Sequence, residues 1–120
     1  MRTKRKEERT LGALAALKGR VYVLLRDDAA KERFVKDCRR EGFSFSDGVF
    51  PSMTAEDGGR VPDRIMSVGP GENVGFTGTM GHLAFHHAEM IGTGKERQKL
   101  IRVDYLSYIG GERRFQIRKG

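Results

Sequence analysis

Two neighbouring segments with different hydrophobic patterns predict the centre of the fold. Residues 20–26 predict a strand. The residues between Arg20 and Arg26 form an apolar run rich in β-branched and aromatic side chains, which is typical of a strand covered on both faces. Residues 29–41 carry apolar side chains mainly at every fourth position, which predicts a helix with one apolar face. Its apolar positions are Ala30, Phe34, Val35 and Cys38. An aspartate, Asp27 or Asp28, can cap the start of this helix, and Gly42 can end it in a left-handed conformation.

Shorter apolar runs downstream predict the remaining strands. They cover residues 43–45, 65–68, 72–77, 100–105 and 113–117. Turns rich in glycine and proline separate several of them, and residues 49–63 are typical of a loop. The order strand–helix–strand–strand–strand–strand predicts an α+β fold with a single, mostly antiparallel sheet and one packed helix.

The N-terminal residues predict a separate basic helix. Between residues 4 and 17, an apolar stripe at spacings of three and four is formed by Leu11, Leu14, Ala15 and Leu17, and Gly19 can end the helix. We therefore expect a basic, amphipathic helical arm over residues 1–19 and a single α+β domain over residues 20–120. The arm either covers the sheet edge or projects from it, and its leucine stripe can serve as an anchor on a partner.

The composition narrows the class of protein. The chain has 120 residues, which fits one domain, and its 23 Lys and Arg against 16 Asp and Glu give a net charge of +7. The single cysteine excludes an internal disulfide framework and a multi-cysteine zinc site. The apolar runs are shorter than the roughly 20 residues that a membrane helix needs. We expect a cytoplasmic protein with no membrane contact, and a homo-oligomer stays open.

The positive charge lies at the two ends of the chain. Residues 1–20 have a net charge of +5, residues 21–92 of −3, and residues 93–120 of +5. Such basic segments attract polyanions, so they predict binding to nucleic acid, to a nucleoprotein complex or to an acidic protein surface. A solubilising tail is the alternative. The candidate binding residues are Arg2, Lys4, Arg5, Lys6, Arg9, Lys95, Arg97, Lys99, Arg113 and Arg114.

Aromatic side chains lie among the C-terminal arginines. They are Tyr105, Tyr108 and Phe115, interspersed with Arg102, Arg113, Arg114 and Arg118. This composition fits stacking on single-stranded nucleic acid, and it fits core-facing strand residues equally well. The signature of RNA-binding sheets is absent.

All three histidines lie within residues 75–87, a segment rich in glycine. If residues 81–91 form a helix, His82 and His86 lie on one face with Glu89 three residues beyond His86, a spacing that can bind a metal ion. As a hairpin, which its glycine and threonine content favours, it places Leu83 and Phe85 in the core. The ligand-binding candidates are Thr77, Thr79, His82 and His86. A ligand-binding, nucleotide-binding or metal-dependent protein that uses this segment is therefore the alternative function, although Leu83 departs from the metalloprotease signature.

No catalytic motif is complete. Residues 92–95 resemble the end of a phosphate-binding loop, but Glu89 and Glu96 occupy positions that need glycine and a hydroxyl residue. Cys38 falls on the apolar face of its helix, where we expect a buried and inert thiol. We therefore expect a non-enzymatic binding protein without a cofactor or a metal.

A resemblance extends this expectation. The strand at residues 20–25, the segment Glu41–Gly48, the segment Gly78–Phe85 and the strand at residues 101–105 resemble small proteins carried by bacterial mobile elements and phages. The resemblance spans about residues 20–110, and it implies an anti-defence setting, as with anti-CRISPR proteins. Many such inhibitors are acidic DNA mimics, whereas this chain is basic. It implies inhibition through bound nucleic acid or an acidic protein surface, and it carries over no functional residues.

Overall fold

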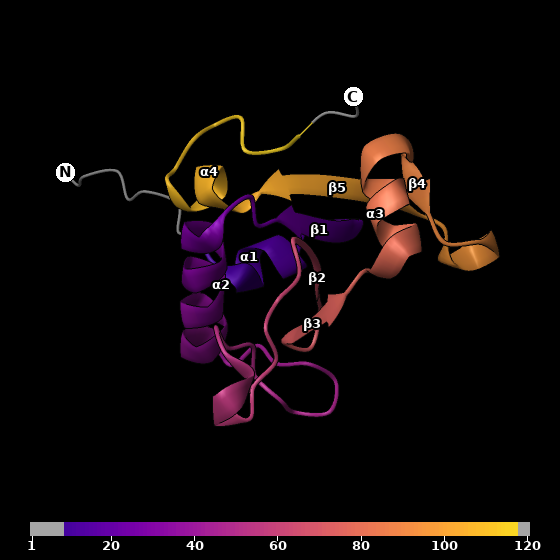
Figure 1. Cartoon of the computed structure of the whole chain (residues 1–120). Coiled ribbons are helices and arrows are strands. Elements are labelled where there is room, and N and C mark those ends of the chain that lie inside the picture. Colours follow the sequence, from indigo (N-terminus) through magenta and orange to yellow (C-terminus); the bar gives the residue numbers. More distant parts are fainter. Residues whose placement is uncertain (1–8, 118–120) are drawn as a thin grey trace.

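A computed structural model describes residues 9–117 and shows one five-stranded sheet with helices on both faces (Figure 1). The strands are β1 (Arg20–Leu24), β2 (Ile65–Gly69), β3 (Asn73–Phe76), β4 (Met90–Ile91) and β5 (Gln98–Asp104). The helices are α1 (Leu11–Ala15), α2 (Asp28–Glu41), α3 (Gly78–His87) and α4 (Tyr105–Ile109). Short 3-10 helices occur at Ala55–Asp57 and Gly94–Glu96. No helix within the described range is long and apolar enough to cross a membrane.

The strand β1 lies at the centre of the sheet, whose order is β3-β2-β1-β5-β4. It pairs antiparallel with β2 and parallel with β5, and the two outer pairs are antiparallel. The sheet is therefore mixed but mostly antiparallel, and the predicted α+β class is confirmed. The central place of β1 agrees with its apolar run, because a central strand is covered on both faces.

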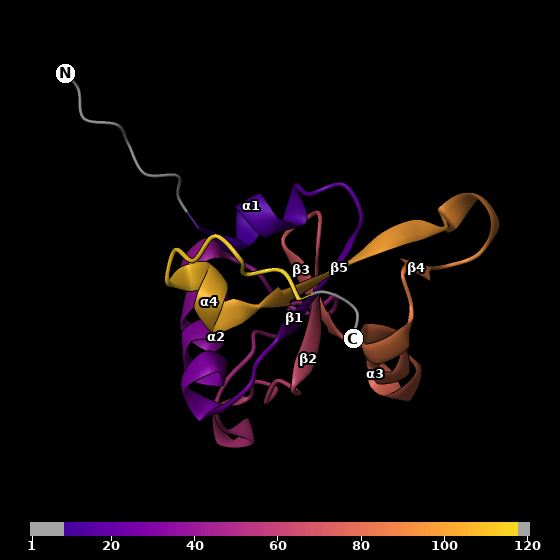
Figure 2. The same cartoon turned by 90° about the horizontal axis from the view of Figure 1, so that it is seen from above.

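Alternate residues of β1 pack into two different clusters. Val21 and Val23 join the larger core, to which α1, α2 and α4 contribute, whereas Tyr22 and Leu24 pack with Phe85 of α3. Figure 2 shows α2 and α4 on one side of the strands and α3 on the other. The alternation follows from strand geometry, because successive side chains point to opposite faces.

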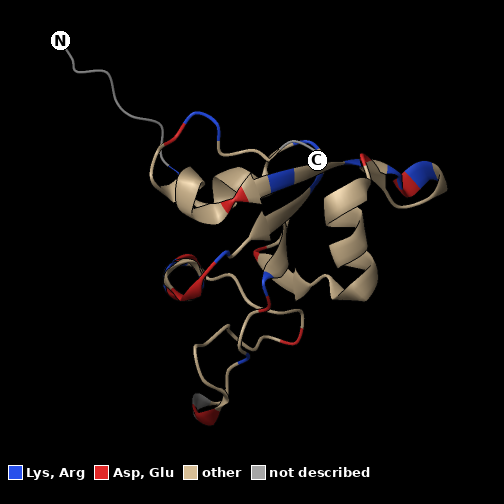
Figure 3. Cartoon of the chain, turned by 45° about the horizontal axis from the view of Figure 1, so that its top comes forward, with Lys and Arg blue, Asp and Glu red and all other residues tan. Residues whose placement is uncertain are grey.

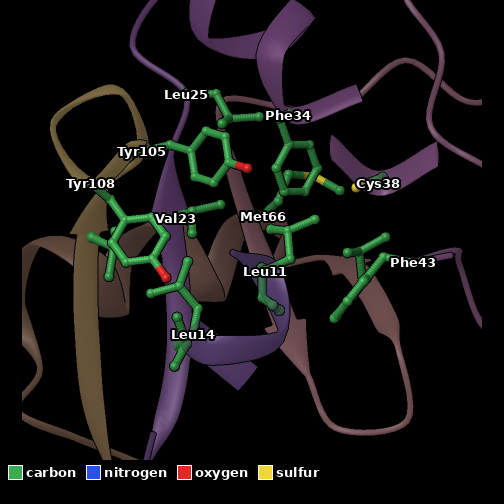
Figure 4. Close-up of a cluster of buried hydrophobic side chains, with 14 of the residues drawn as sticks. Leu11, Leu14, Val23, Leu25, Phe34, Cys38, Phe43, Met66, Tyr105 and Tyr108 are labelled. Carbon is green, nitrogen blue, oxygen red and sulfur yellow. The ribbon is translucent and has the colours of Figure 1, made fainter. Parts of the chain in front are cut away.

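The helix α2 begins and ends as its sequence predicts. Asp27 accepts a hydrogen bond from the backbone N–H of Ala30 at 2.9 Å, and Gly42 ends the helix at φ 82°. Phe34 and Cys38 are fully buried, as predicted. Figure 4 shows the Phe34 side chain beside Tyr105 of α4, and the centroids of the two rings are 5.5 Å apart.

One charged residue of α2 is buried. Asp37 is 2% exposed and accepts hydrogen bonds from the hydroxyl of Tyr105 at 2.5 Å, from Nε of Arg33 and from Nη2 of Arg40. The sequence analysis did not single out this carboxylate, although its position three residues after Phe34 places it beside the apolar face of the helix. It links α2 to α4 through a buried hydrogen bond.

The helix α1 is shorter than the predicted helix at residues 4–17. It begins after Thr10, whose side chain accepts from the N–H of Ala13, and it buries Leu11 and Leu14 in the larger core. Glu41 of α2 accepts from the N–H groups of Leu11 and Gly12. Residues 1–8 lie outside the described part, so the arm at residues 1–19 stays a prediction, and residues 11–15 pack as part of the domain.

Two predicted strands are wrong. Residues 43–45 contribute only an isolated bridge between Ser44 and Asn73, and residues 113–117 contribute one between Gln116 and Val103. Between β5 and the second bridge, residues 105–109 form a helix that the sequence pattern did not predict. Tyr105 and Tyr108 both enter the core from this helix, because side chains three residues apart lie on one helical face.

The hairpin favoured for residues 75–87 is also wrong, because residues 78–87 form α3, and the helical alternative holds as far as His87. Gly81 and Phe85, four residues apart, face the sheet, while Leu83 is 52% exposed. The glycine at position 81 serves close packing and not a turn, since a Cβ there would collide with the side chain of Thr77. Gly78, in contrast, adopts φ 71° where the chain turns from β3 into α3, so the glycines of this segment serve both a turn and close packing.

Two buried ionisable groups predict a loss of stability in alkaline solution. Burial raises the pKa of Cys38, and burial together with the hydrogen bond to Asp37 raises the pKa of Tyr105. The unfolded chain ionises these groups above about pH 8.5 and about pH 10, whereas the folded chain keeps them protonated. The folded state then binds more protons than the unfolded state. The free energy of unfolding therefore keeps its full value below about pH 8.5 and falls above that pH.

Urea unfolding at pH 7, 9 and 10.5 measures this effect. We expect a decrease that starts near pH 9, and the variant Cys38→Ala should delay its start to about pH 10. An unfolding free energy that stays constant from pH 7 to 10.5 would contradict the prediction.

Candidate functional site

The outer edge of β5 is covered by two different segments. At its start β5 pairs with β4, and the N–H of Leu100 donates to the carbonyl of Glu89 at 2.9 Å. At its end, the N–H of Ile117 donates to the carbonyl of Arg102 at 2.8 Å. The partner of the edge thus changes between Leu100 and Arg102, and a cavity lies at this junction.

The cavity has a volume of about 1030 Å³ and a basic lining. It is lined by Glu89, Lys99, Leu100, Arg102, Arg113, Arg114, Gln116 and Ile117. Four of these side chains are cationic and one is a carboxylate, so the cavity has a formal charge of +3. Figure 3 shows the basic residues on β5, on the turn between β4 and β5 and on the C-terminal segment, while α3 carries neither Lys or Arg nor Asp or Glu.

Arg102 is the buried charged residue of the lining. It is 5% exposed and donates from Nε to the carbonyl of Phe85 and from Nη2 to the carbonyls of Ala84 and Ala88. These carbonyls belong to the C-terminal turn of α3, where the helix dipole favours a cation. No carboxylate among the described residues forms an ion pair with Arg102.

Burial lowers the pKa of Arg102, and the charge of Glu89 opposes this shift. The guanidinium keeps its proton at neutral pH, because its ordinary pKa lies above 12. The cavity therefore contains a permanent buried cation whose orientation is set by α3.

Arg9 positions the basic C-terminal segment. It donates to the carbonyls of Tyr108 and Glu112 at 3.1 and 3.2 Å, and its guanidinium lies 4.8 Å from the ring centroid of Phe115. Cation–π contact and hydrogen bonds thus hold both ends of the segment that includes the two arginines between Glu112 and Phe115. Arg9 was predicted to bind a partner, and in the structure it contacts its own chain.

The other predicted cationic residues fall into three groups. Lys99, Arg113 and Arg114 line the cavity and are exposed. Lys95 and Arg97 lie exposed in the turn between β4 and β5. Arg2, Lys4, Arg5 and Lys6 lie outside the described residues.

The predicted ligand-binding residues on α3 do not converge on a site. Nε2 of His82 lies 3.1 Å from Oδ2 of Asp63, whereas the ring of His86 packs edge-on against Phe85. The hydroxyl of Thr77 donates to the carbonyl of Ile65, and Thr79 is exposed. Within residues 9–117, no three His, Cys, Asp or Glu side chains are grouped as a metal site would need. His82, His86 and Glu89 are thus not brought together as metal ligands.

Sequence reasoning did not assign Arg102 to the candidate site. A signal was present, because an arginine within an otherwise apolar strand is a polar group at a position that the strand pattern buries. Gln116 and Ile117 carried no such signal, since they enter the site only through their pairing with β5.

The fold and the site define a small α+β protein with a basic cavity at the edge of its sheet. No protein-family model, curated protein or solved structure matches this chain.

Proposed function

We propose that this protein is a non-enzymatic nucleic-acid-binding protein that binds phosphate groups in the cavity beside β5. The observation that supports the proposal is the convergence of Lys99, Arg102, Arg113 and Arg114 on one cavity. Phosphates are the anions that such groups bind through charge-assisted hydrogen bonds. Arginine adds a planar fork of donors that matches phosphate oxygens.

The distribution of charge favours nucleic acid over a small anion. Lys95 and Arg97 lie exposed on the turn that leads into β5, so the basic surface continues beyond the cavity. A polyanion can contact both regions, whereas a small anion occupies the cavity alone. Phosphate contacts carry no sequence information, so we expect binding without strong sequence preference.

The salt dependence of binding tests this proposal. For a single strand, the slope of the logarithm of the binding constant against the logarithm of salt is about −0.7 per phosphate contact. Four contacts predict a slope of about −3, and the double variant Arg113→Gln/Arg114→Gln should reduce it in magnitude by about 1.4. Fluorescence anisotropy with a labelled single-stranded DNA of mixed sequence, from 50 to 300 mM salt, measures both slopes.

The matched control is Lys36→Gln/Arg64→Gln. It removes the same charge at two exposed positions that do not line the cavity. We expect its slope to equal that of the wild type within the error. Equal slopes for the wild type, the cavity variant and the control variant would show that binding does not depend on the cavity residues, and this result would contradict a role of the cavity. Retention of an acidic host protein after nuclease treatment, with no DNA binding, would favour a protein partner instead.

The resemblance to mobile-element and phage proteins extends the proposal to an anti-defence role. A nucleoprotein nuclease offers bound nucleic acid whose phosphates this cavity could contact. Expression of the wild type in a host with an active defence nuclease should then restore phage plaques, and Arg113→Gln/Arg114→Gln should not. Restoration of plaques by both the wild type and the variant would show that the anti-defence role does not depend on the cavity.

A further inference from the structure

The cavity beside β5 combines one buried, oriented arginine with three exposed cationic side chains. We propose that it binds a terminal phosphate group, a phosphomonoester, so that the protein recognises a phosphorylated end of a nucleic acid. This inference rests on the proposed function and names the part of the nucleic acid that enters the cavity.

Two segments that are hydrogen-bonded to β5 flank the cavity. Glu89, which precedes β4, lines the cavity on one side, and Gln116 and Ile117 line it on the other. Both segments are hydrogen-bonded to β5, since Leu100 donates to Glu89 and Ile117 donates to Arg102. A chain end can enter between these segments without passing either of them.

The number of cationic groups at the cavity favours a terminal phosphate over an internal one. An internal phosphate carries one negative charge, whereas a terminal phosphate carries about −1.5 to −2 at neutral pH and has three terminal oxygens. Lys99, Arg113 and Arg114 are exposed at the cavity, and Arg102 lies buried in its wall. This excess of cations gains more from a dianion than from a monoanion, because each charge adds an attractive contact.

The guanidinium of Arg102 is already fixed in position beside the cavity. Hydrogen bonds to the carbonyls at the end of α3 hold its guanidinium before any ligand arrives. Little side-chain freedom is lost when an anion binds beside it, and its burial strengthens the interaction. The flexible Lys99 and Arg114 can then close on the phosphate from the exposed side.

Three labelled single strands of the same sequence test the inference. One carries a 5′-phosphate, one a 3′-phosphate, and one hydroxyl groups at both ends. We expect one phosphorylated strand to bind at least about 5-fold more tightly than the strand with two hydroxyl ends, since one added charge contact in water contributes about 1 kcal/mol or more. The variant Lys99→Gln/Arg114→Gln should abolish this ratio, and Lys36→Gln/Arg64→Gln should preserve it.

The outcomes distinguish the two proposals. Equal binding of all three strands, with the salt slope of the wild type intact, would overturn the terminal-phosphate inference and leave the proposed function standing. Absence of binding to every strand would overturn the proposed function. Competition by inorganic phosphate or by a nucleoside monophosphate at the strand's own concentration would show that the polymer adds nothing, and it would overturn recognition of a nucleic-acid end.

Discussion

Replacing Lys99, Arg113 and Arg114 together with glutamate is expected to weaken binding of single-stranded DNA about 1,000-fold at 0.15 M salt. Each phosphate contact in water contributes about 1 kcal/mol, and reversal replaces this attraction with a repulsion of similar size. Screening reduces the resulting sum of about 6 kcal/mol to about 4 kcal/mol, which corresponds to about 1,000-fold. Fluorescence anisotropy at several salt concentrations measures the loss.

The control for this variant is Lys31→Glu/Lys36→Glu/Arg64→Glu, which changes the net charge by the same amount away from the cavity lining. We expect it to weaken binding less than 10-fold, through the long-range field alone. Circular dichroism of both variants checks that the fold is kept. If the two variants lose the same affinity, binding depends on net charge and the cavity has no special role.

Substituting Asp37 with alanine is expected to lower the free energy of unfolding by about 3 kcal/mol. The substitution leaves the hydroxyl of Tyr105 buried without its acceptor, and an orphaned buried donor costs about 1–3 kcal/mol. Arg33 and Arg40 also lose their ion pairs with Asp37, at a smaller cost because both arginines are exposed to water and Arg40 keeps its pair with Glu41. Urea unfolding at pH 7 measures the change.

Two further variants separate the hydrogen bond from a general effect of mutation. The double variant Asp37→Ala/Tyr105→Phe should be at least as stable as Asp37→Ala, because it removes the orphaned hydroxyl together with its acceptor. The exposed residue Lys36 on the same helix serves as a control, and Lys36→Ala should change stability by less than about 0.5 kcal/mol. A loss below about 1 kcal/mol for Asp37→Ala would contradict the role of this buried carboxylate.

The elements that local chemistry determines were predicted well. The run at residues 20–26 became β1, and α2 begins after Asp27 and ends at Gly42, as its caps predict. Each of these signals acts within a few residues, through capping hydrogen bonds or through the spacing of apolar side chains. The segment 75–87 was harder, because glycine permits a turn and also permits close helix packing. The tertiary structure shows both uses, since Gly78 turns the chain at φ 71° and Gly81 allows close packing on Thr77.

The candidate site was predicted in part. Lys99, Arg113 and Arg114 were named from their charge, but so were four residues outside the described range and Arg9, which contacts its own chain. The charge pattern along the chain identifies groups that attract phosphate, but it does not show which of these groups lie together in the fold. Arg102 was not assigned, since its role depends on the carbonyls at the end of α3.

By itself, the sequence determined the class of the fold, the central strand with its helix, the buried place of Cys38 and the basic character of both ends. These properties depend on side-chain type and local spacing. Only the tertiary structure decided that β5 pairs in parallel with β1 and that its outer edge is shared by β4 and residues 115–117. That division of the edge forms the basic cavity, because long-range pairing brings together charged residues that are separated along the chain.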